Sequence, residues 1–318
     1  MKNVVFCAYA YDTNMLGSTN IASGNAAKGK DIYMKNIVVA TVSAKRALTP
    51  PRKVETDVAI VTNISIEEPY ASILKNNGVL IYTEPFDEFN LGSDYRWGLA
   101  FYKLCALKKM LSYGYDNYLL MDTDTYTFSD FSDLWDQTKD YLMLYDIGHR
   151  PTVPNCAKFY REAYEFAGID RQITKYGGEF IAGNRQNMNA FIVEAENVFC
   201  QLKDKDFHTT GGDEFIINNV AYKMSGSIKN AANYIARYWT SPGFYRVATN
   251  HIYDPISIMH LPTEKQCGIL VIYKYLIKKK KLPSVNKAFK ILNVPRTPSK
   301  FQIVIYKIKR VLTMKFRT

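Results

Sequence analysis

Two acidic residues follow directly on a short apolar run. Asp122 and Asp124 come after Tyr118–Met121, four residues typical of a central strand that is buried on both faces. Ligands of an open α/β sheet bind at the carboxyl ends of its strands, and side chains two positions apart in extended chain point the same way. Hard divalent cations take carboxylate oxygens and complete their shell with substrate phosphates. The pair therefore predicts a metal ion that holds a diphosphate, with two acids in a solvated turn as the simpler alternative.

Other chemistries for this triplet can be tested on the sequence. An EF-hand loop that began at Asp122 would need glycine at its sixth position and glutamate at its twelfth, where the chain has Thr127 and Asp133. A phosphatase of the haloacid dehalogenase type places threonine or valine four residues after an aspartate on its first strand. Here Tyr126 holds that position and the strand is not the first. A glycosidase pair of carboxylates stays open, because such acids need not be adjacent in sequence.

Three segments carry a resemblance to a known family. Phe101–Thr125 resembles the helix, strand and DxD block of the family 8 glycosyltransferases, which include glycogenin and bacterial lipopolysaccharide hexosyltransferases. Gly211–Asn218 is similar to the family's GGDQxxxN segment and His260–Lys265 to its HxxGxxK segment, in the same order. The resemblance implies an α/β fold of the GT-A class, a Rossmann-like nucleotide-diphospho-sugar transferase fold with a mixed central sheet.

The resemblance also implies roles for individual residues. Mn²⁺ or Mg²⁺ would be bound by Asp122, Asp124 and His260, and the residues implied in catalysis are Asp213 and Glu214. Donor binding would use Ala8, Tyr9 and Tyr11 at the nucleobase, Lys265 at the diphosphate, Lys103 and Thr123 elsewhere on the donor, and Asp146 and Asp213 at the transferred sugar. No residue is implied for acceptor binding.

The chain departs from the family's pattern in three places. Glu214 stands where the family has glutamine, so it could act as a nucleophile, stabilise an oxocarbenium-like transition state, or serve as an acid at a helix N-terminus. Lys265 lies one residue early, and the glycine of HxxGxxK is missing. Gly177-Gly178-Glu179 is an altered counterpart of the family's Asn-Ala-Gly turn, and we expect it to form a wall of the pocket.

Alternating strand and helix patterns supply the elements that position these residues, as in an α/β domain with a largely parallel sheet. The predicted strands are Val4–Ala10, Asp57–Thr62, Val79–Tyr82, Tyr118–Met121, Tyr141–Tyr145 and Phe180–Ala182, and the predicted helices are Ile32–Leu48 and Tyr95–Leu111. Residues 148–175 suit a segment inserted over the site. Together with residues 234–250, we expect them to shape the pocket that selects the sugar and the acceptor. Tyr238, Trp239 and Phe244 could line this pocket or could equally belong to the core.

The charge of the chain is divided between two regions. The 318 residues carry a net charge of +11, but residues 272–318 contain 14 Lys and Arg and no acid, which leaves residues 1–271 at −3. Phe301, Val304, Ile305, Ile308 and Leu312 fall on one face of a basic amphipathic helix, a pattern that binds anionic lipid surfaces. We therefore predict a catalytic domain over residues 1–271 and a membrane-associating tail over residues 272–318. Helices packed on the catalytic domain, with a solvated basic face, are the alternative.

The remaining composition narrows the location and the partners. No run approaches the roughly 18 apolar residues of a transmembrane helix, and Val4–Ala10 is too short for a signal peptide. Five separated cysteines without CxxC spacing favour free thiols in a reducing compartment. Residues 1–271 offer nucleic acid no basic groove, so we expect no nucleic-acid partner. The expected location is cytoplasmic and peripheral, at the inner face of a membrane.

Taken together, these patterns predict a metal-dependent glycosyltransferase. It would move a hexose from a nucleotide diphosphate sugar, with UDP-sugar as the expected donor, to a surface glycan or lipid-linked saccharide acceptor, as in lipopolysaccharide or capsule biosynthesis. Retention of anomeric configuration follows from the resemblance alone. The alternatives are a metal-dependent phosphohydrolase, which would keep the aspartate pair without needing a nucleotide sugar, and a non-enzymatic adaptor that binds lipid or nucleic acid through the basic tail.

Overall fold

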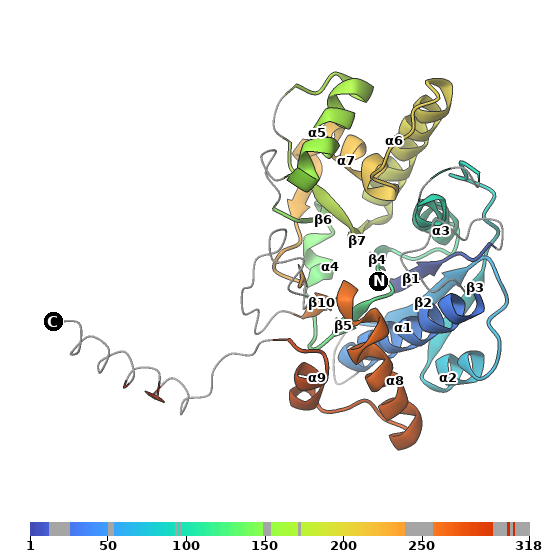
Figure 1. Cartoon of the computed structure of the whole chain (residues 1–318), viewed down its shortest axis with the longest axis vertical. Helices are drawn as coiled ribbons and strands as arrows, with labels where there is room; N and C mark the ends of the chain where they lie inside the picture. The colour runs from blue at the N-terminus through green and yellow to red at the C-terminus, as the bar shows by residue number, and fades with distance from the viewer. Residues whose placement is uncertain are drawn as a thin grey trace.

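A mixed sheet of seven strands forms the centre of the molecule (Figure 1). The structure is a computed structural model that describes residues 1–12, 26–49, 54–92, 95, 97–148, 154–170, 173–238, 257–294, 304, 305 and 308. In spatial order the strands are β3 (Val79–Thr83), β2 (Thr56–Thr62), β1 (Asn3–Tyr9), β4 (Asn117–Met121), β7 (Tyr176–Asn184), β6 (Leu142–Asp146) and β8 (Ile228–Asn230). The first four run parallel, whereas β7 is antiparallel to both of its neighbours. The predicted mixed α/β sheet is confirmed.

β1 and β4 lie at the centre of the sheet because both faces of these strands are apolar. All seven residues of β1 and all five of β4 are buried. Along β1, Phe6 belongs to the core cluster on one face and Cys7 to a cluster on the opposite face. Strands of this kind need helices on both sides. Since Cys7 pairs with Met121, the carboxyl ends of the two strands lie at the same edge of the sheet.

Helices cover both faces of the sheet (Figure 1). One face carries the helices that pack around Phe6 and Leu120, namely α3 (Tyr102–Leu111), α6 (Arg185–Asp204) and α7 (Asp213–Lys223). The other face carries α1 (Ala26–Ala47), with α2 (Tyr70–Asn76) beside it, and α4 (Leu134–Gln137). The helix predicted over Tyr95–Leu111 begins instead as a 3₁₀ turn, η2 (Gly98–Phe101), that continues into α3. α5 (Pro154–Ala167) lies in the segment predicted as an insertion.

A second, three-stranded sheet completes the edge where β4 ends. It consists of β5 (Thr125–Thr127), β10 (Ile258–His260) and β9 (Ile235–Arg237). β10 runs antiparallel to β5 and parallel to β9, so His260 pairs with Thr125 on one side and with Arg237 on the other. This small sheet brings residues that are more than 100 positions apart in sequence next to the Asp-Thr-Asp turn.

The packed body of the molecule continues beyond the predicted domain boundary. That boundary, between residues 271 and 272, falls inside α8 (Gly268–Lys279), which follows the 3₁₀ turn η5 (Pro262–Gln266). Ile272 is fully buried with residues of α1, and Phe289 of α9 (Val285–Ile291) stacks on Phe128 with ring centroids 4.1 Å apart. The described body therefore runs to residue 294.

The amphipathic helix predicted over residues 301–312 lies mostly outside the described residues. Val304, Ile305 and Ile308 are described, and all three are exposed. In the described part of the chain, no helix combines the length and the apolar character needed to cross a bilayer.

Candidate active site

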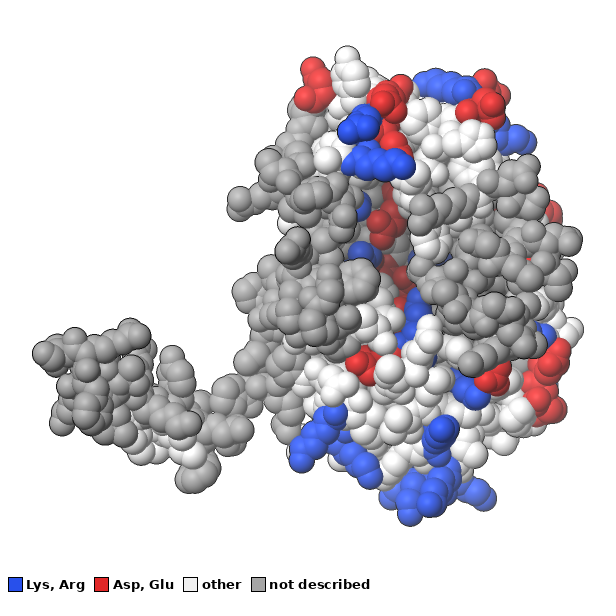
Figure 2. Space-filling model, viewed as in Figure 1, with Lys and Arg blue, Asp and Glu red and all other residues white. Residues whose placement is uncertain are grey.

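A cavity of about 440 Å³ opens where β1 and β4 end. Ten of the residues predicted from sequence line it, namely Ala8, Tyr9, Lys103, Asp122, Thr123, Asp124, Asp213, Glu214, His260 and Lys265. In the space-filling view, acidic side chains lie along a hollow in the middle of this face, with Lys and Arg beside them (Figure 2). The topology of the sheet thus gathers segments that are separated in sequence into one charged cavity.

Hydrogen bonds from three directions fix the turn that carries the two acids. The N–H of Asp122 donates to the carbonyl of Glu179 on β7 at 3.2 Å. The hydroxyl of Thr125 donates to the carbonyl of Asp122 at 2.9 Å, and the N–H of Leu261 donates to the carbonyl of Asp124 at 2.9 Å. Because β7 and the segment after β10 both anchor the turn, its carboxylates have defined positions.

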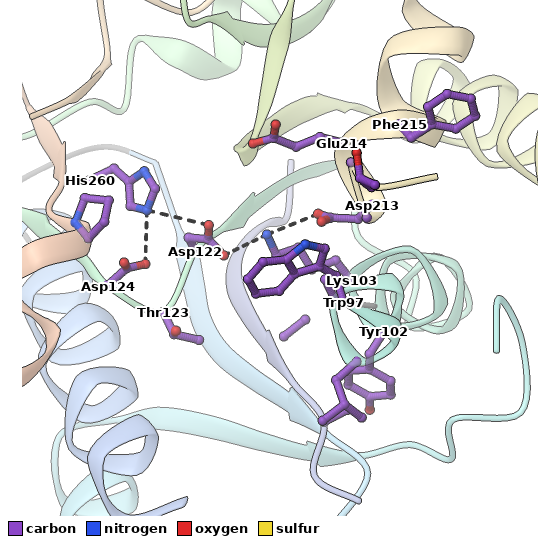
Figure 3. A pocket seen from close by; sticks show the side chains of 18 of the residues that line it. Trp97, Tyr102, Lys103, Asp122, Thr123, Asp124, Asp213, Glu214, Phe215 and His260 are labelled. Atoms are coloured by element: carbon purple, nitrogen blue, oxygen red, sulfur yellow. Dashed lines mark hydrogen bonds and ion pairs between the residues drawn. The ribbon is translucent and has the colours of Figure 1, made fainter. Parts of the chain in front are cut away.

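Asp122, Asp124 and His260 form a cluster with the donor set of a metal site. One ligand atom from each of the three lies within 4.8 Å of the others. The Nε2 atom of His260 is 3.1 Å from Asp124 Oδ1 and 3.7 Å from Asp122 Oδ2 (Figure 3). Two carboxylates and an imidazole can together ligate a divalent cation. The three side chains present therefore fit a divalent cation, and Asp124 Oδ2 has the ammonium group of Lys265 at 3.1 Å as its charge partner.

Buried charges compensate one another within this cluster. Burial raises the pKa of the Asp124 carboxyl, but Lys265, with Nζ 3.1 Å from Oδ2, and His260 outweigh burial and hold that pKa well below its usual range. Burial lowers the pKa of the His260 imidazole, but Asp124 and Glu179 raise it to about 9. A metal-bound histidine is neutral, so a cation binding here would replace the proton on Nε2.

Lys103 joins the metal cluster to the start of α7. Its Nζ lies 2.8 Å from Asp122 Oδ1 and 3.2 Å from Asp213 Oδ2 (Figure 3). Burial raises the pKa of the Asp213 carboxyl to about 6, and the nearby charges of Glu214 and Asp122 add to that shift, although Lys103 opposes it. Ionising Asp213 in the folded chain therefore costs free energy, and shifted pKa values of this kind are typical of functional sites.

Glu214, next to Asp213 in sequence, faces different partners. Its Oε1 accepts a hydrogen bond from Arg237 Nη2 at 3.0 Å, and its Oε2 lies 3.8 Å from Lys175 Nζ. The residue is also in the first turn of α7, where a negative charge is stabilised by the helix dipole. These contacts hold an anionic oxygen at the wall of the cavity, where the family that the sequence resembles has an amide.

Comparisons with known proteins establish the fold. No protein-family model matches the sequence, and no curated protein sequence matches it. Among solved structures, the chain is similar to the crystal structure of mouse xyloside xylosyltransferase 1 in its apo form, with a TM-score of 0.52 and 11% sequence identity. The match covers 82% of this chain and 97% of that chain. Together with the mixed sheet, this likeness confirms the predicted GT-A fold class.

Two of the predicted donor-binding residues lie outside the cavity lining. The N–H of Tyr11 donates to Asn63 Oδ1, and Lys30 lies over the Tyr11 ring at 5.4 Å. Asp146 Oδ1 accepts a hydrogen bond from the N–H of Gly148 at 2.7 Å, so its carboxylate folds back onto its own turn. The pairing of β6 with β7 shifts register between Leu144 and Asp146. The position of Asp146 along the strand therefore does not predict that its side chain reaches the cavity.

Several residues of the cavity were not singled out in the sequence. Tyr33 of α1 lies beside Tyr9, with ring centroids 5.4 Å apart, and Lys265 Nζ is 5.5 Å from the Tyr33 ring. Trp97 lines the cavity next to Lys103 (Figure 3). No local sequence pattern marks these side chains as cavity residues. Tyr33 looks like any other apolar position of a helix, and Trp97 lies just before a helix.

α5 contributes a further wall of the cavity. Phe159 and Glu162 line it from this helix. The Glu162 carboxylate accepts hydrogen bonds from the hydroxyls of Thr209 and Thr210, at 2.8 and 2.6 Å, and so anchors the loop that leads into α7. This supports the prediction that residues 148–175 lie over the site. In residues 234–250, Tyr238 is buried in the core, whereas Trp239 and Phe244 lie outside the described residues.

Proposed function

We propose that the chain is a metal-dependent glycosyltransferase that uses a nucleotide diphosphate sugar. The observation that carries the proposal is the cluster of Asp122, Asp124 and His260 in a cavity of a GT-A fold, with Lys103 and Lys265 beside it. Nucleotides bind at the carboxyl ends of strands in α/β sheets. Acidic ligands for a cation, next to two lysine ammonium groups, suit the binding of a diphosphate.

The cation would be Mn²⁺ or Mg²⁺, held by the three residues of the cluster. When bound, it would neutralise the charge that develops on the departing nucleoside diphosphate. Lys265 would contact the same diphosphate and provide a second positive charge. Because Lys265 already pairs with the buried Asp124, its ammonium group is held at the cavity wall and loses little freedom on binding.

We propose a UDP-sugar as the donor. Ala8 and Tyr9 line the cavity at the end of β1, and the Tyr33 ring is adjacent, so aromatic surface is available for a nucleobase. Lys103 and Asp213 would contact the transferred hexose, for which their paired charges offer both a donor and an acceptor of hydrogen bonds. The choice of uridine and of a hexose is supported by the sequence resemblance.

The acceptor would enter from the side of α5. Phe159 and Lys158 line the cavity there, and Lys175 Nζ lies 5.2 Å from the Phe159 ring and 3.8 Å from Glu214 Oε2. We propose a surface glycan or a lipid-linked saccharide as the acceptor, whose hydroxyl attacks the anomeric carbon. Retention of configuration is supported by the resemblance.

We further propose that the enzyme works at the cytoplasmic face of a membrane. The support is the basic composition of residues 272–318, which carry no acid, and the exposed apolar side chains of Val304, Ile305 and Ile308. Basic residues near an anionic lipid surface contribute about 1 kcal/mol each to binding. Residues 1–271, with a net charge of −3, would face the cytoplasm.

A nucleotide-sugar panel tests the proposed activity. The purified chain is incubated with several UDP-, GDP- and ADP-sugars, with Mn²⁺ or with a chelator, and release of nucleoside diphosphate is measured. We expect one UDP-sugar to turn over with Mn²⁺, no turnover with chelator, and a loss of roughly 100-fold or more in Asp124→Asn. Asp136→Asn, an exposed acid paired with Lys139, is the matched control and should retain wild-type turnover.

Two results would count against the proposal. Release of inorganic phosphate without need for a nucleotide sugar would indicate a phosphohydrolase. Equal turnover by Asp124→Asn and the wild type would remove the metal cluster from the chemistry.

A further inference from the structure

Glu179, on β7, contacts two of the chain segments that build the metal cluster. Its carbonyl accepts the N–H of Asp122 at 3.2 Å, and its Oε1 lies 3.3 Å from Nδ1 of His260. The Glu179 side chain is 0% exposed. When Glu179 accepts the Nδ1 proton, the Nε2 atom of His260 is left to face Asp122 and Asp124. One residue therefore orients both the acidic turn and the imidazole.

Arg237, on β9, holds the Glu179 carboxylate with two hydrogen bonds. Arg237 Nε donates to Glu179 Oε1 at 2.6 Å, and Nη2 donates to Oε2 at 2.5 Å. The same Nη2 donates to Glu214 Oε1 at 3.0 Å. A planar guanidinium can bind two carboxylates at fixed angles, which a lysine ammonium cannot do. Arg237 thus links Glu179, behind the metal cluster, to Glu214, which lines the cavity.

Gly177 leaves the space that this pair occupies. A Cβ atom at Gly177 would lie 1.9 Å from Glu179 Oε2 and 2.6 Å from Arg237 Nη2. Gly177 does not adopt positive φ, so the backbone itself would accept alanine. The glycine is therefore required by the charged pair and not by the backbone conformation of β7.

We infer that Glu179 and Arg237 form a positioning pair that orients the metal ligand His260 and, through the shared guanidinium, the cavity acid Glu214. This inference rests on the proposed function. A carboxylate behind a metal-bound histidine fixes the orientation of the ring and raises its affinity for the metal. A buried ion pair gains little net stability, because desolvation offsets the attraction of the charges, so stability alone does not explain its presence. Neither residue ligates the cation.

Mn²⁺ binding to the full chain without donor tests the pair independently of turnover. Free Mn²⁺ is measured by its electron paramagnetic resonance signal during titration. We expect Glu179→Gln to weaken Mn²⁺ binding by roughly 10- to 100-fold. Two further variants should also weaken Mn²⁺ binding. Arg237→Lys keeps the positive charge but loses the two parallel hydrogen bonds of the guanidinium. Gly177→Ala keeps every charge but displaces the pair.

Asn117→Ala is the matched control for a general loss of stability. Asn117 is buried in β4 at the end of the strand away from the cavity, where it bonds to Asn3 and Thr138. We expect this variant to lower the melting temperature without changing the Mn²⁺ dissociation constant.

Steady-state kinetics separate the two parts of the inference. At saturating Mn²⁺, Glu179→Gln should recover most of its kcat, whereas Arg237→Lys should not, because Glu214 also loses its partner. The inference is overturned if Glu179→Gln and Arg237→Lys bind Mn²⁺ within twofold of the wild type while their melting temperatures fall. Absence of Mn²⁺ binding and of donor turnover in the wild type would instead reject the proposed function, and the inference with it.

Discussion

Asp213 and Glu214 are adjacent acids whose surroundings give them different properties. Asp213 is buried against Lys103, and burial raises its pKa to about 6. Glu214 is a quarter exposed and faces Arg237 and Lys175. Charge alone would give the two residues the same role, whereas their partners differ: Lys103 links Asp213 to Asp122 of the metal cluster, and Glu214 contacts Arg237 and Lys175.

The raised pKa of Asp213 predicts a pH-dependent cost in stability. Its pKa is about 6 in the folded chain, against an ordinary value of 3.8 for an aspartate in water, so between these values the folded state binds more protons and stability falls as pH rises. We expect Asp213→Asn to be more stable than the wild type by up to about 3 kcal/mol above pH 6, and by little near pH 4. Urea denaturation of the metal-free protein at both pH values measures the difference. A gain that is equal at pH 4 and pH 7 would contradict this explanation.

The contacts of Glu214 predict the effect of replacing its carboxylate with an amide, the group that the family resembled by the sequence has at this position. In Glu214→Gln the amide oxygen can still accept the hydrogen bond from Arg237, so we expect transfer within roughly tenfold of the wild type. The measurement is kcat with the donor identified in the panel. A loss of several thousand-fold, or a covalent glycosyl adduct on Glu214, would assign this residue as a nucleophile.

At the scale of elements, the start of α7 depends on a glycine. Gly212 precedes α7 with φ of +59°, a conformation that residues with a side chain rarely adopt. A Cβ atom there would lie 3.0 Å from Cβ of Trp97. The glycine therefore permits both the turn that presents Asp213 and the close approach of the segment before η2.

Gly212→Ala should therefore reduce both stability and activity. We expect a loss of about 1–2 kcal/mol in the free energy of unfolding, together with a lower kcat, because the first turn of α7 must shift. Gly226→Ala is the matched control, since this exposed glycine has open space around its Cβ position and should change stability by less than about 0.5 kcal/mol. Unchanged unfolding and kcat in Gly212→Ala would show that the turn tolerates a side chain.

The central apolar strands could be predicted from the sequence, and the three-residue strands β9 and β10 could not. Val4–Ala10 and Tyr118–Met121 are found as β1 and β4, because a central strand must be apolar on both faces. β9 and β10 have three residues each and acquire their register only by pairing with one another and with β5. Arg237 lies on β9, which explains why local pattern gave no sign of its role.

At the scale of the whole molecule, α8 and α9 belong to the packed body. α8 and α9 bury Ile269, Ile272, Leu276, Phe289 and Leu292 against the face that carries α1. The basic residues of this region lie on the exposed sides of the same helices, so its net charge does not by itself mark a separate domain. Within the described residues, the packed body thus continues past residue 271 as far as residue 294.

Two truncations test this boundary. Removing residues 272–318 would take away four of these buried side chains. The burial of each stabilises the fold by about 1.5–3 kcal/mol, and the sum is comparable with the total free energy of unfolding of a typical domain. We expect residues 1–271 not to fold, and residues 1–294 to fold and to retain donor turnover. Circular dichroism and nucleoside diphosphate release report the two outcomes. Full activity in residues 1–271 would contradict the extended body.

The same truncation tests the proposed membrane binding. We expect the full chain to sediment with vesicles that contain phosphatidylserine, and residues 1–294 to bind them more weakly, because seven of the 14 basic residues lie beyond residue 294. Neutral phosphatidylcholine vesicles are the control. Equal sedimentation of the two chains would place any lipid contact on the body instead of the tail.

The sequence by itself determined the fold class, the central strands and ten of the residues that line the cavity. The α/β class, the central strands, Asp122 and Asp124 follow from local properties, since apolar strands must be central and acids that follow them must lie at the edge where ligands bind. The GT-A class and the other eight residues follow from the resemblance to a known family. The tertiary structure decided which charges meet. Arg237 and Tyr33 enter the site through strand pairing and helix packing, and Asp146 leaves it through a shift in register. Glu179, expected as a wall of the pocket, is instead buried against Nδ1 of His260. Distances between such side chains depend on how β7, β9 and β10 come together, which sequence spacing does not encode.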